Sequence, residues 1–420
     1  MVQQLHKRFS DDQIKDLIRR YLKQEIARSY IQEILGIKRR RFCLLVKQYR
    51  ANPDTFTVRY QRKTKPRAIA PSIEKNIITE LTIDKRLIEN KAVPLKRYNY
   101  SYVKTRLETE YHQKVSLPTI IKRAKEYGFY LKKKQKKSPH DREVITNYIG
   151  ELIQHDASYH LWSPLAGEKW YLITSLDDYS RFMLYAMLLK QETSWAHIAA
   201  LQTVFLRYGL PYSYYVDSHR IFRFVQGRDS IWRRHYLFTD DVRTQWQQVM
   251  DDCGVKVIPA LSPQAKGKVE RPYGWLQDRL IRTGVREDVT DIHQAQRVLR
   301  SELHRYNYQQ RHSTTKEVPY FRFRNAQHEK KSLFREFTVR APFISAKDIF
   351  CFRIRRIIDN YRKISIYNLH LRVNNAIPRE TVELRIYPLN NDLCEIRFWL
   401  KSKLVDVQTV KATDLPGVHL

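Results

Sequence analysis

The chain has 420 residues, with 77 Lys and Arg against 44 Asp and Glu, so its formal net charge at pH 7 is +33. Hydrophobic residues make up 42% and aromatic residues 12%, enough for packed cores, which excludes a disordered polypeptide. The positive excess favours a polyanionic partner, with nucleic acid as the common case and a membrane surface as the alternative.

Hydropathy and cysteine usage narrow the class of protein further. No run of eighteen apolar residues occurs, and the start MVQQLHKRFSDDQ has no apolar signal region. The cysteines lack CxxC spacing, which is typical of reduced core cysteines and not of disulfides or structural zinc. They are Cys43, Cys253, Cys351 and Cys394. We therefore expect a soluble intracellular protein of roughly two to four domains.

Residues 1–55 are predicted to form a helix-turn-helix DNA-binding domain. Residues 11–50 show three apolar stripes at helical spacing, the first expected to be capped by Asp11 or Asp12 and the second to end at Gly36. A helix, a glycine-containing turn and a basic helix form the helix-turn-helix pattern. The alternative is that the basic helix is an ordinary solvated face. The predicted DNA contacts are Lys38, Arg39, Arg40 and Arg41.

Residues 68–137 are predicted to form a second helical, helix-turn-helix-like DNA-binding domain with a basic linker. The segment before it, QRKTKPRAIAPS at 61–72, has the composition of a linker. Ser116 is expected to cap a helix that tolerates Pro118 in its first turn and ends at Gly128. A solvated charge run is the alternative for the basic linker LKKKQKK. The predicted DNA contacts are Lys122, Arg123, Lys132, Lys133 and Lys134.

Residues 145–315 are predicted to form a mixed-sheet core. Strands are expected at 151–160, 169–176, 181–189, 212–218 and 255–260, with helices at about 194–208, at 244–253 and after the fifth strand. Three strands joined by hairpins, followed by alternating helices and strands, make a mixed sheet with helices packed on it. This order is the ribonuclease H-like topology.

Three acids far apart in the sequence converge in this topology. Asp156 lies in the first strand, Asp217 ends the fourth strand, and Glu270 lies in the segment after the fifth. Converging carboxylates repel one another unless a cation intervenes, and Mg²⁺ is the usual one because it prefers oxygen ligands. Two ions about 4 Å apart serve in-line phosphoryl transfer, and Mn²⁺ can substitute. The alternative is that each acid is a turn former or an ion-pair partner.

A basic and aromatic segment follows Asp217, and basic residues surround Glu270. The segment SHRIFRFVQGRDSIWRRHYLF alternates arginines for phosphates with aromatics for base stacking, although a hairpin with packed aromatics is an equal alternative. The predicted DNA contacts here are Arg220, Arg223, Arg233, Arg234, Lys266, Lys268 and Arg271. Nearby, we expect Asp177 and Asp178 to shape a hairpin, and His155, His160 and His219 to make structural hydrogen bonds.

Residues 340–412 are predicted to form a small basic β-barrel. Short strand patterns recur at regular spacing from FCFRIRRIID to KLVDVQTV. Turn signals such as Asn374-Asn375 and Asn390-Asn391 separate several of them.

The core resembles the DDE transposases of bacterial insertion sequences, which share the retroviral-integrase catalytic domain. The matching stretches are IQHDASYHLW, ITSLDDYSRF, YYVDSHRIF and TQWQQVMDDCGVKVIPALSPQAKGKVERPYGWLQDRL. The resemblance implies that Asp156, Asp217 and Glu270 are the metal-binding catalytic triad. It also implies hydrolytic nicking at the ends of a mobile element, followed by attack of the freed 3′-hydroxyl on target DNA.

Two features depart from the family pattern. Ala157 follows the first acid, where glycine is frequent in relatives. Pro272 and Gly274 follow Glu270 closely, and because proline removes a backbone donor we expect the helix to kink or begin there.

The sequence thus predicts a multidomain α/β protein with N-terminal helix-turn-helix units, a ribonuclease H-like catalytic core and a C-terminal small β-barrel. The predicted function is that of a metal-dependent transposase in the bacterial cytoplasm, associated with the nucleoid. Its expected partners are double-stranded DNA, as element ends and as target, and further copies of itself, because two ends must meet. The alternatives are a DNA-binding protein with an inactive integrase-like core and a ribonuclease H-like nuclease without strand transfer.

Overall fold

The computed structural model describes residues 5–59, 69–131, 145–217, 219, 221–222, 243–260, 267–367 and 369–416, and for residues 267–271 it describes the backbone alone. The chain divides into two compact units, Met1–Glu74 and Lys75–Leu420. In the part of the chain so described, no helix combines the length and apolar character needed to cross a membrane.

The first unit contains three helices around a core of its own. After a short 3-10 turn at Leu5–Lys7 come α1 (Asp11–Leu22), α2 (Arg28–Leu35) and α3 (Arg39–Ala51). Gly36 ends α2 in the left-handed conformation, as the sequence predicts. The core is built from one side of each helix and from the segment after α3, with Ile14, Ile18, Ile31, Leu35, Phe42, Leu45, Phe56 and Val58 buried.

The cap of α1 differs from the prediction. Ser10 caps the helix, and its side chain and that of Gln13 bond each other's backbone N–H groups in a capping box. Asp11 instead accepts hydrogen bonds from the Thr57 hydroxyl and the Val58 backbone N–H, both at 2.9 Å. The Asp11 carboxylate, one of the two candidates for the cap, therefore bonds the segment after α3 to the start of α1.

The second unit begins with three helices that precede the sheet. They are α4 (Pro71–Glu89), which runs across the boundary between the units, α5 (Tyr100–Glu110) and α6 (Leu117–Glu126). The Ser116 hydroxyl accepts from the Thr119 backbone N–H at 3.3 Å, so the predicted cap of α6 is confirmed.

The central sheet of the second unit has the predicted mixed order. Its strands are β1 (Leu152–His160), β2 (Trp170–Asp177), β3 (Met183–Leu189), β4 (Ser213–Val216) and β5 (Lys256–Pro259), in the order β3-β2-β1-β4-β5. β1 pairs antiparallel with β2 and β2 with β3, whereas β4 runs parallel to both β1 and β5.

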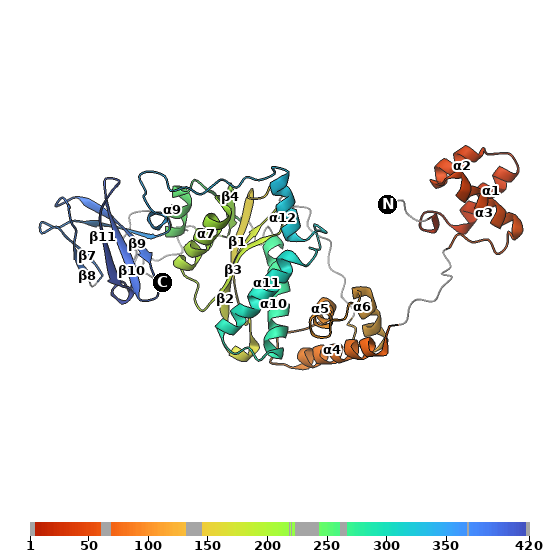
Figure 1. Ribbon diagram of the computed structural model, residues 1–420, viewed down its shortest axis with the longest axis horizontal. Coiled ribbons are helices and arrows are strands. Elements are labelled where there is room, and N and C mark those ends of the chain that lie inside the picture. The colour runs from red at the N-terminus through yellow and green to blue at the C-terminus, as the bar shows by residue number, and fades with distance from the viewer. Residues whose placement is uncertain are drawn as a thin grey trace. The chain divides into compact units, whose positions relative to one another are not determined.

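Helices cover both faces of this sheet (Figure 1). On one face α7 (Ser194–Tyr208) and α9 (Gln245–Asp252) pack with Ile153, Ile198, Phe205 and Trp246 in one hydrophobic cluster. On the other face α10 (Gly267–Arg286) and α11 (Ile292–Tyr308) pack with a second cluster, which includes Leu172, Leu176, Leu276, Leu280 and Leu299. The short helix α12 (Pro319–His328) follows.

The C-terminal strands form an open sheet rather than the expected barrel. β6 (Phe352–Ile357), β9 (Thr381–Pro388), β10 (Leu393–Leu400) and β11 (Lys403–Lys411) are ordered β11-β10-β9-β6, and β7 (Lys363–Ile366) pairs only with β8 (Leu369–Arg372) among the described strands. Side chains join this hairpin to its neighbours, since Arg356 donates to the Ser365 carbonyl and Gln408 to the Arg372 carbonyl. A closed barrel needs backbone hydrogen bonds between each pair of neighbouring strands. These two side-chain hydrogen bonds do not supply them.

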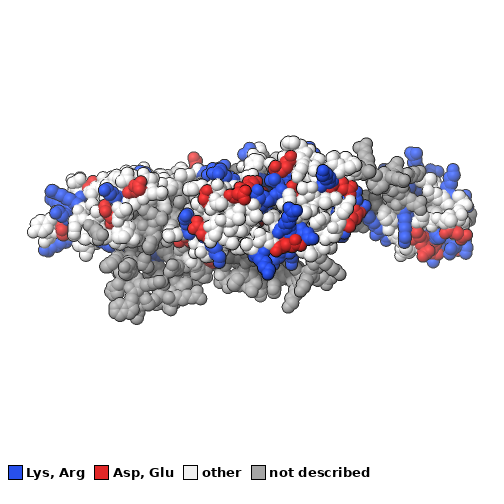
Figure 2. Space-filling view, turned by 90° about the horizontal axis from the view of Figure 1, so that it is seen from below, with Lys and Arg blue, Asp and Glu red and all other residues white. Residues whose placement is uncertain are grey.

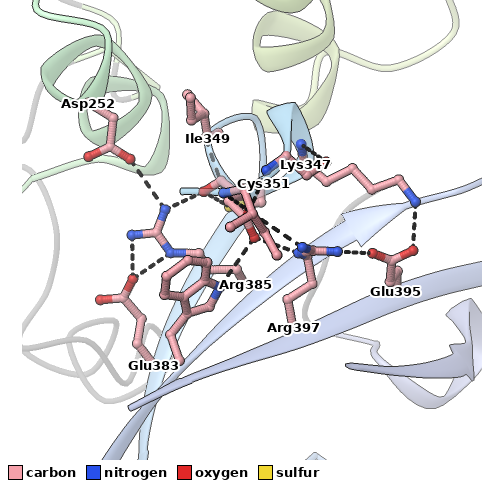
Figure 3. Close-up of polar contacts among 12 residues, drawn as sticks. Asp252, Lys347, Ile349, Cys351, Glu383, Arg385, Glu395 and Arg397 are labelled. Carbon is pink, nitrogen blue, oxygen red and sulfur yellow. Dashed lines mark hydrogen bonds and ion pairs between the residues drawn. The ribbon is translucent and has the colours of Figure 1, made fainter. Parts of the chain in front are cut away.

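The C-terminal sheet is docked on the central one through buried arginines. The Asp252 carboxylate at the end of α9 accepts from Arg353 at 2.5 Å and from Arg385 at 3.4 Å, and Arg385 also pairs with Glu383 at 2.7 Å (Figure 3). The Gln245 amide donates to the Arg353 carbonyl and accepts from its N–H, and so pairs with the edge of β6 as a neighbouring strand would.

Candidate active site

Two of the three predicted acids lie side by side in the central sheet. Parallel pairing of β1 with β4 ends with Gln154 opposite Tyr215. Continued for two more residues, this register would place Asp156 opposite Asp217, which directly follows the last residue of β4. Because neighbouring strands are about 4.8 Å apart, we expect these two carboxyl groups to lie close together near the end of β4.

The Asp156 side chain points to the face of the sheet that α10 covers. Asp156 pairs across the antiparallel ladder with Thr174, and directly opposed residues point to the same face. The Thr174 hydroxyl is 2.7 Å from the hydroxyl of Tyr273 in α10. His155, one residue earlier, points the other way and stacks on Trp246 of α9 with ring centroids 6.1 Å apart, as strand alternation requires.

Tyr273 links the helix to the first acid. Its hydroxyl donates to the Asp156 backbone carbonyl at 2.7 Å. Burial raises the pKa of Tyr273 well above its usual value, and the negative charges of Asp156, Glu192 and Asp217 raise that pKa further. The hydroxyl therefore stays protonated, and both sheet acids lie within electrostatic reach of it.

Glu270 lies one turn before Tyr273 in the same helix. Its backbone is helical. The helix begins at Gly267 and runs through Pro272, so it does not begin at the proline. Pro272 lacks the N–H that would bond the carbonyl of residue 268. The Glu270 side chain lies outside the described residues.

The two aspartates suit a hard cation by chemistry and by exposure. Both side chains are half-buried, and Asp217 also accepts from the His219 backbone N–H at 3.0 Å. Carboxylate oxygens are the protein ligands that Mg²⁺ prefers. No three His, Cys, Asp or Glu side chains gather at metal-binding spacing among the described residues, a set that leaves out the Glu270 side chain. The triad therefore stays a prediction.

Asp177 and Asp178 have structural roles, as predicted. Asp177 accepts from the backbone N–H groups of Gly150 and Ser180, each at 2.8 Å, and so shapes the turn after β2. Asp178 is buried and pairs with Arg181 at 2.8 Å. Both carboxylates are thereby committed to protein donors and not presented to a ligand.

Sequence reasoning missed a buried hydrogen-bonded chain behind the site. The His155 ring lies 2.9 Å from the Ser175 hydroxyl and 2.8 Å from the His197 ring, which in turn lies 3.0 Å from Glu192. His155 therefore makes the structural hydrogen bonds that were predicted for it. Its partners His197 and Glu192 come from α7 and the segment before it, and nothing in their local sequence indicates the contact.

The predicted DNA contacts that can be placed lie on α3 and α6. The side chains of Lys38, Arg39, Arg40 and Arg41 are exposed at the start of α3. On α6 Lys122 is exposed, and Arg123 pairs with Glu126 at 2.6 Å. Lys132, Lys133, Lys134, Arg220, Arg223, Arg233, Arg234 and Lys266 lie outside the described residues, as do the side chains of Lys268 and Arg271.

The surface charges in Figure 2 are mixed. Over the described part of the face shown, Lys and Arg alternate with Asp and Glu and do not gather into one continuous basic patch.

Comparison with known proteins points to transposases. No protein-family model matches the chain. A Sinorhizobium fredii protein named "Putative transposase y4bF" is 28% identical over 195 residues, which is 46% of this chain and 41% of that protein. The transposase for insertion sequence IS1202 of Streptococcus pneumoniae is 30% identical over 173 residues, 41% of this chain and 36% of that protein. The matches thus span less than half the length of these relatives.

Solved structures similar to the chain include retroviral integrases. An intasome of simian T-cell lymphotropic virus in complex with a PP2A regulatory subunit matches 73% of this chain and 96% of that one, at 12% identity and a TM-score of 0.35. The HTLV-2 integrase catalytic core domain in complex with magnesium matches 43% of this chain and 98% of that one, at 16% identity and a TM-score of 0.31. At these TM-scores the likeness carries no argument about function. The sequence matches show that this chain is similar to transposases, including one of an insertion sequence.

Proposed function

We propose that this chain is a metal-dependent transposase that nicks the ends of a mobile DNA element and transfers the freed 3′-hydroxyls to target DNA. Asp156, Asp217 and Glu270 are the proposed metal ligands. The observation that supports the proposal is the parallel pairing of β1, which contains Asp156, with β4, which Asp217 directly follows. The sequence similarity to transposases supports the same reading.

The three carboxylates hold the divalent cation in this proposal. Bound magnesium supplies activation of the attacking oxygen and stabilisation of the leaving oxygen in an in-line phosphoryl transfer. The carboxylates fit such an ion because they are hard oxygen donors whose mutual repulsion the ion relieves. Asp156 lies in β1 and Asp217 directly follows the neighbouring strand β4, which supports their assignment as ligands of one site.

The start of α3 supports a DNA contact by the first unit. Lys38 is the N-cap residue and makes no side-chain capping bond, and no acidic residue occurs in the first turn. Cations at the positive end of a helix destabilise it, whereas a phosphate at the same place is stabilised by both the helix and these side chains. Four consecutive basic residues there are thus better explained by a phosphate partner than by helix stability.

Several copies of the chain are proposed to act together on DNA. Joining two element ends to one target requires two active sites held at a fixed spacing. The proposed partners are therefore double-stranded DNA and further copies of this chain.

Cleavage and joining of labelled DNA that carries the sequences flanking the gene tests the proposal. Wild type is expected to nick and join in Mg²⁺ or Mn²⁺. Asp156→Asn, Asp217→Asn and Glu270→Gln are expected to bind the DNA but to lose both reactions by about 10³-fold or more, because each removes a metal ligand.

Asp251→Asn is the matched control for the loss of one carboxylate charge. Asp251 lies on α9 and pairs with Arg243 at 2.8 Å on the exposed surface, so the change should leave both reactions intact. Equal binding by all variants with no cutting by wild type in either metal would show a DNA-binding protein with an inactive core. Cutting without joining would show a nuclease.

A further inference from the structure

A buried tyrosine connects the helix of the third predicted acid to the strand of the first. Tyr273 is 6% exposed and packs in the cluster formed by α10, α11 and β2. Leu276 and Leu280, three and seven residues further on, belong to the same cluster. The aromatic ring alone satisfies this packing, so the hydroxyl group needs a separate explanation.

The Tyr273 hydroxyl makes two hydrogen bonds. It donates its single proton to the Asp156 carbonyl at 2.7 Å, so the Thr174 hydroxyl, also at 2.7 Å, must donate to the tyrosine oxygen. Asp156 and Thr174 face each other across β1 and β2. The tyrosine thus bonds both members of the strand pair that carries the first acid.

The turn of α10 around Tyr273 is weak as a helix. Pro272 precedes the tyrosine and Gly274 follows it, and these are the two poorest helix-forming residue types. A Cβ added at Gly274 would meet nothing within 4 Å among the described residues, so packing does not require the glycine. The conformation of this turn therefore depends on tertiary contacts, of which the Tyr273 hydrogen bonds are the most specific.

We propose that Tyr273 is a positioning residue, whose hydroxyl ties the turn of α10 that carries Glu270 to the Asp156 backbone. The inference rests on the proposed function in one respect, which is that Glu270 and Asp156 share a cation. The hydroxyl touches neither substrate nor metal in this account. It holds the helical backbone near Glu270 against the backbone of Asp156.

Tyr273→Phe, compared with Tyr306→Phe, tests this tie. Tyr306 is also 6% exposed and lies in the same cluster, but its hydroxyl has no hydrogen-bond partner within the described part of the chain. Both changes remove one oxygen from a buried ring, and only the first removes the tie.

Amide hydrogen exchange measures how firmly the turn of α10 around Tyr273 is held, and the measurement needs neither DNA nor metal. The amides of Arg271 and of residues 273–277 are the relevant ones, since the first four N–H groups of a helix lack intrahelical acceptors and Pro272 has no N–H. Tyr273→Phe is expected to speed their exchange by about tenfold, and Tyr306→Phe to leave it unchanged. Unchanged exchange in Tyr273→Phe overturns the inference, whether or not the protein cuts DNA.

Mn²⁺ affinity and kcat measure the effect of this hydrogen bond on the proposed metal site. With wild-type affinity for end DNA and an unchanged KM, Tyr273→Phe should lower kcat and weaken Mn²⁺ binding by about 10- to 100-fold, as loss of a group that orients metal ligands does. Tyr306→Phe should match wild type in both. Faster exchange together with wild-type kcat and Mn²⁺ affinity would overturn the link to the metal site. A wild type that neither binds Mn²⁺ nor cuts would contradict the proposed function while the exchange result still decides the tie.

Discussion

Asp177 is a buried carboxyl group at the end of β2, where the turn to β3 begins. Burial raises its pKa to about 6, although hydrogen bonds from Ser180 and Gly150 oppose that rise. The ordinary value, which the unfolded chain retains, is 3.8. The folded state therefore holds the Asp177 proton more tightly than the unfolded state does, and the stability that this group contributes is greatest below pH 4.

The difference in unfolding free energy between wild type and Asp177→Asn is expected to depend on pH. As pH rises from about 4 through 6, wild type should lose about 3 kcal/mol relative to the variant, because a shift of one pKa unit corresponds to about 1.4 kcal/mol. Urea denaturation of both proteins at several pH values measures this difference. The contributions of the other titratable groups are the same in both proteins and cancel in it. A difference that stays constant between pH 4 and 7 would show that Asp177 is not the raised group.

For single residues, the sequence predicts the candidate acids but not most of the side chains that pack around them. Asp156 and Asp217 are found from strand alternation and chain order, since both depend on local patterns. The spacing of Tyr273 three residues after Glu270 was available as a signal, because it predicts a shared helix side. The contact of His197 with His155 was not, since it depends on how α7 packs against the sheet.

Helix α10 is fastened to α4 and to the segment before α5 through Arg282 and Arg286. Arg282 is fully buried and bonds Asp84 of α4, the Arg97 carbonyl at 2.5 Å and Asp278 at 2.9 Å. One turn further, Arg286 makes two bonds to Glu80, at 2.6 and 2.9 Å. The helix that carries Glu270 at its start is thus held by ion pairs at its end.

Arg282→Met is expected to destabilise the second unit by about 3–5 kcal/mol, because it leaves Asp84 buried without a counter-charge. The double variant Arg282→Met/Asp84→Leu should recover part of that loss, since the uncompensated carboxylate is gone. Urea midpoints followed by tryptophan fluorescence provide the measurement. Arg300→Met, at an exposed position of α11, is the control and should change stability by about 0.5 kcal/mol or less. A midpoint for Arg282→Met equal to that of the control would contradict the account.

The sequence predicts the type and position of the helices and strands well. It predicts less well where they end and which strands pair. The strands of the central sheet and the caps at Gly36 and Ser116 follow from local rules. Ser10 was missed as a cap because Asp11 and Asp12 are equally good capping residue types. The open C-terminal sheet could not be predicted, since strand patterns do not show whether the first and last strands of a sheet pair with each other.

The C-terminal strands and the central sheet share one hydrophobic core. The ring of Phe205 in α7 lies 6.0 Å from that of Phe350, and Trp195 lies 5.4 Å from Tyr387 of β9. One cluster of buried residues includes both parts. The first unit differs, because the buried residues of its own cluster lie between Ile14 and Val58 in the described part of that unit. The predicted boundary at residue 340 therefore separates parts of the chain that stabilise each other.

Two truncations are expected to behave differently. A chain of residues 1–340 should precipitate or melt well below the full chain, because it exposes Phe205 and Trp195 and leaves Asp252 without Arg353 and Arg385. A chain of residues 69–420 should stay folded and keep the melting temperature of the second unit. Scanning calorimetry of both chains beside the full protein measures this. A stable, monodisperse chain of residues 1–340 would show that the shared core contributes little.

Iron-directed cleavage of the polypeptide tests whether Asp156, Asp217 and Glu270 share one metal site, as proposed. Fe²⁺ replaces Mg²⁺ at such a site, and with ascorbate and peroxide it generates radicals that cut the backbone next to the ion. Cuts are expected beside all three acids. Mg²⁺ should compete with them, and Asp156→Asn should lose every one of them. Cuts at other places, or cuts beside Glu270 that persist in Asp156→Asn, would contradict a shared metal site.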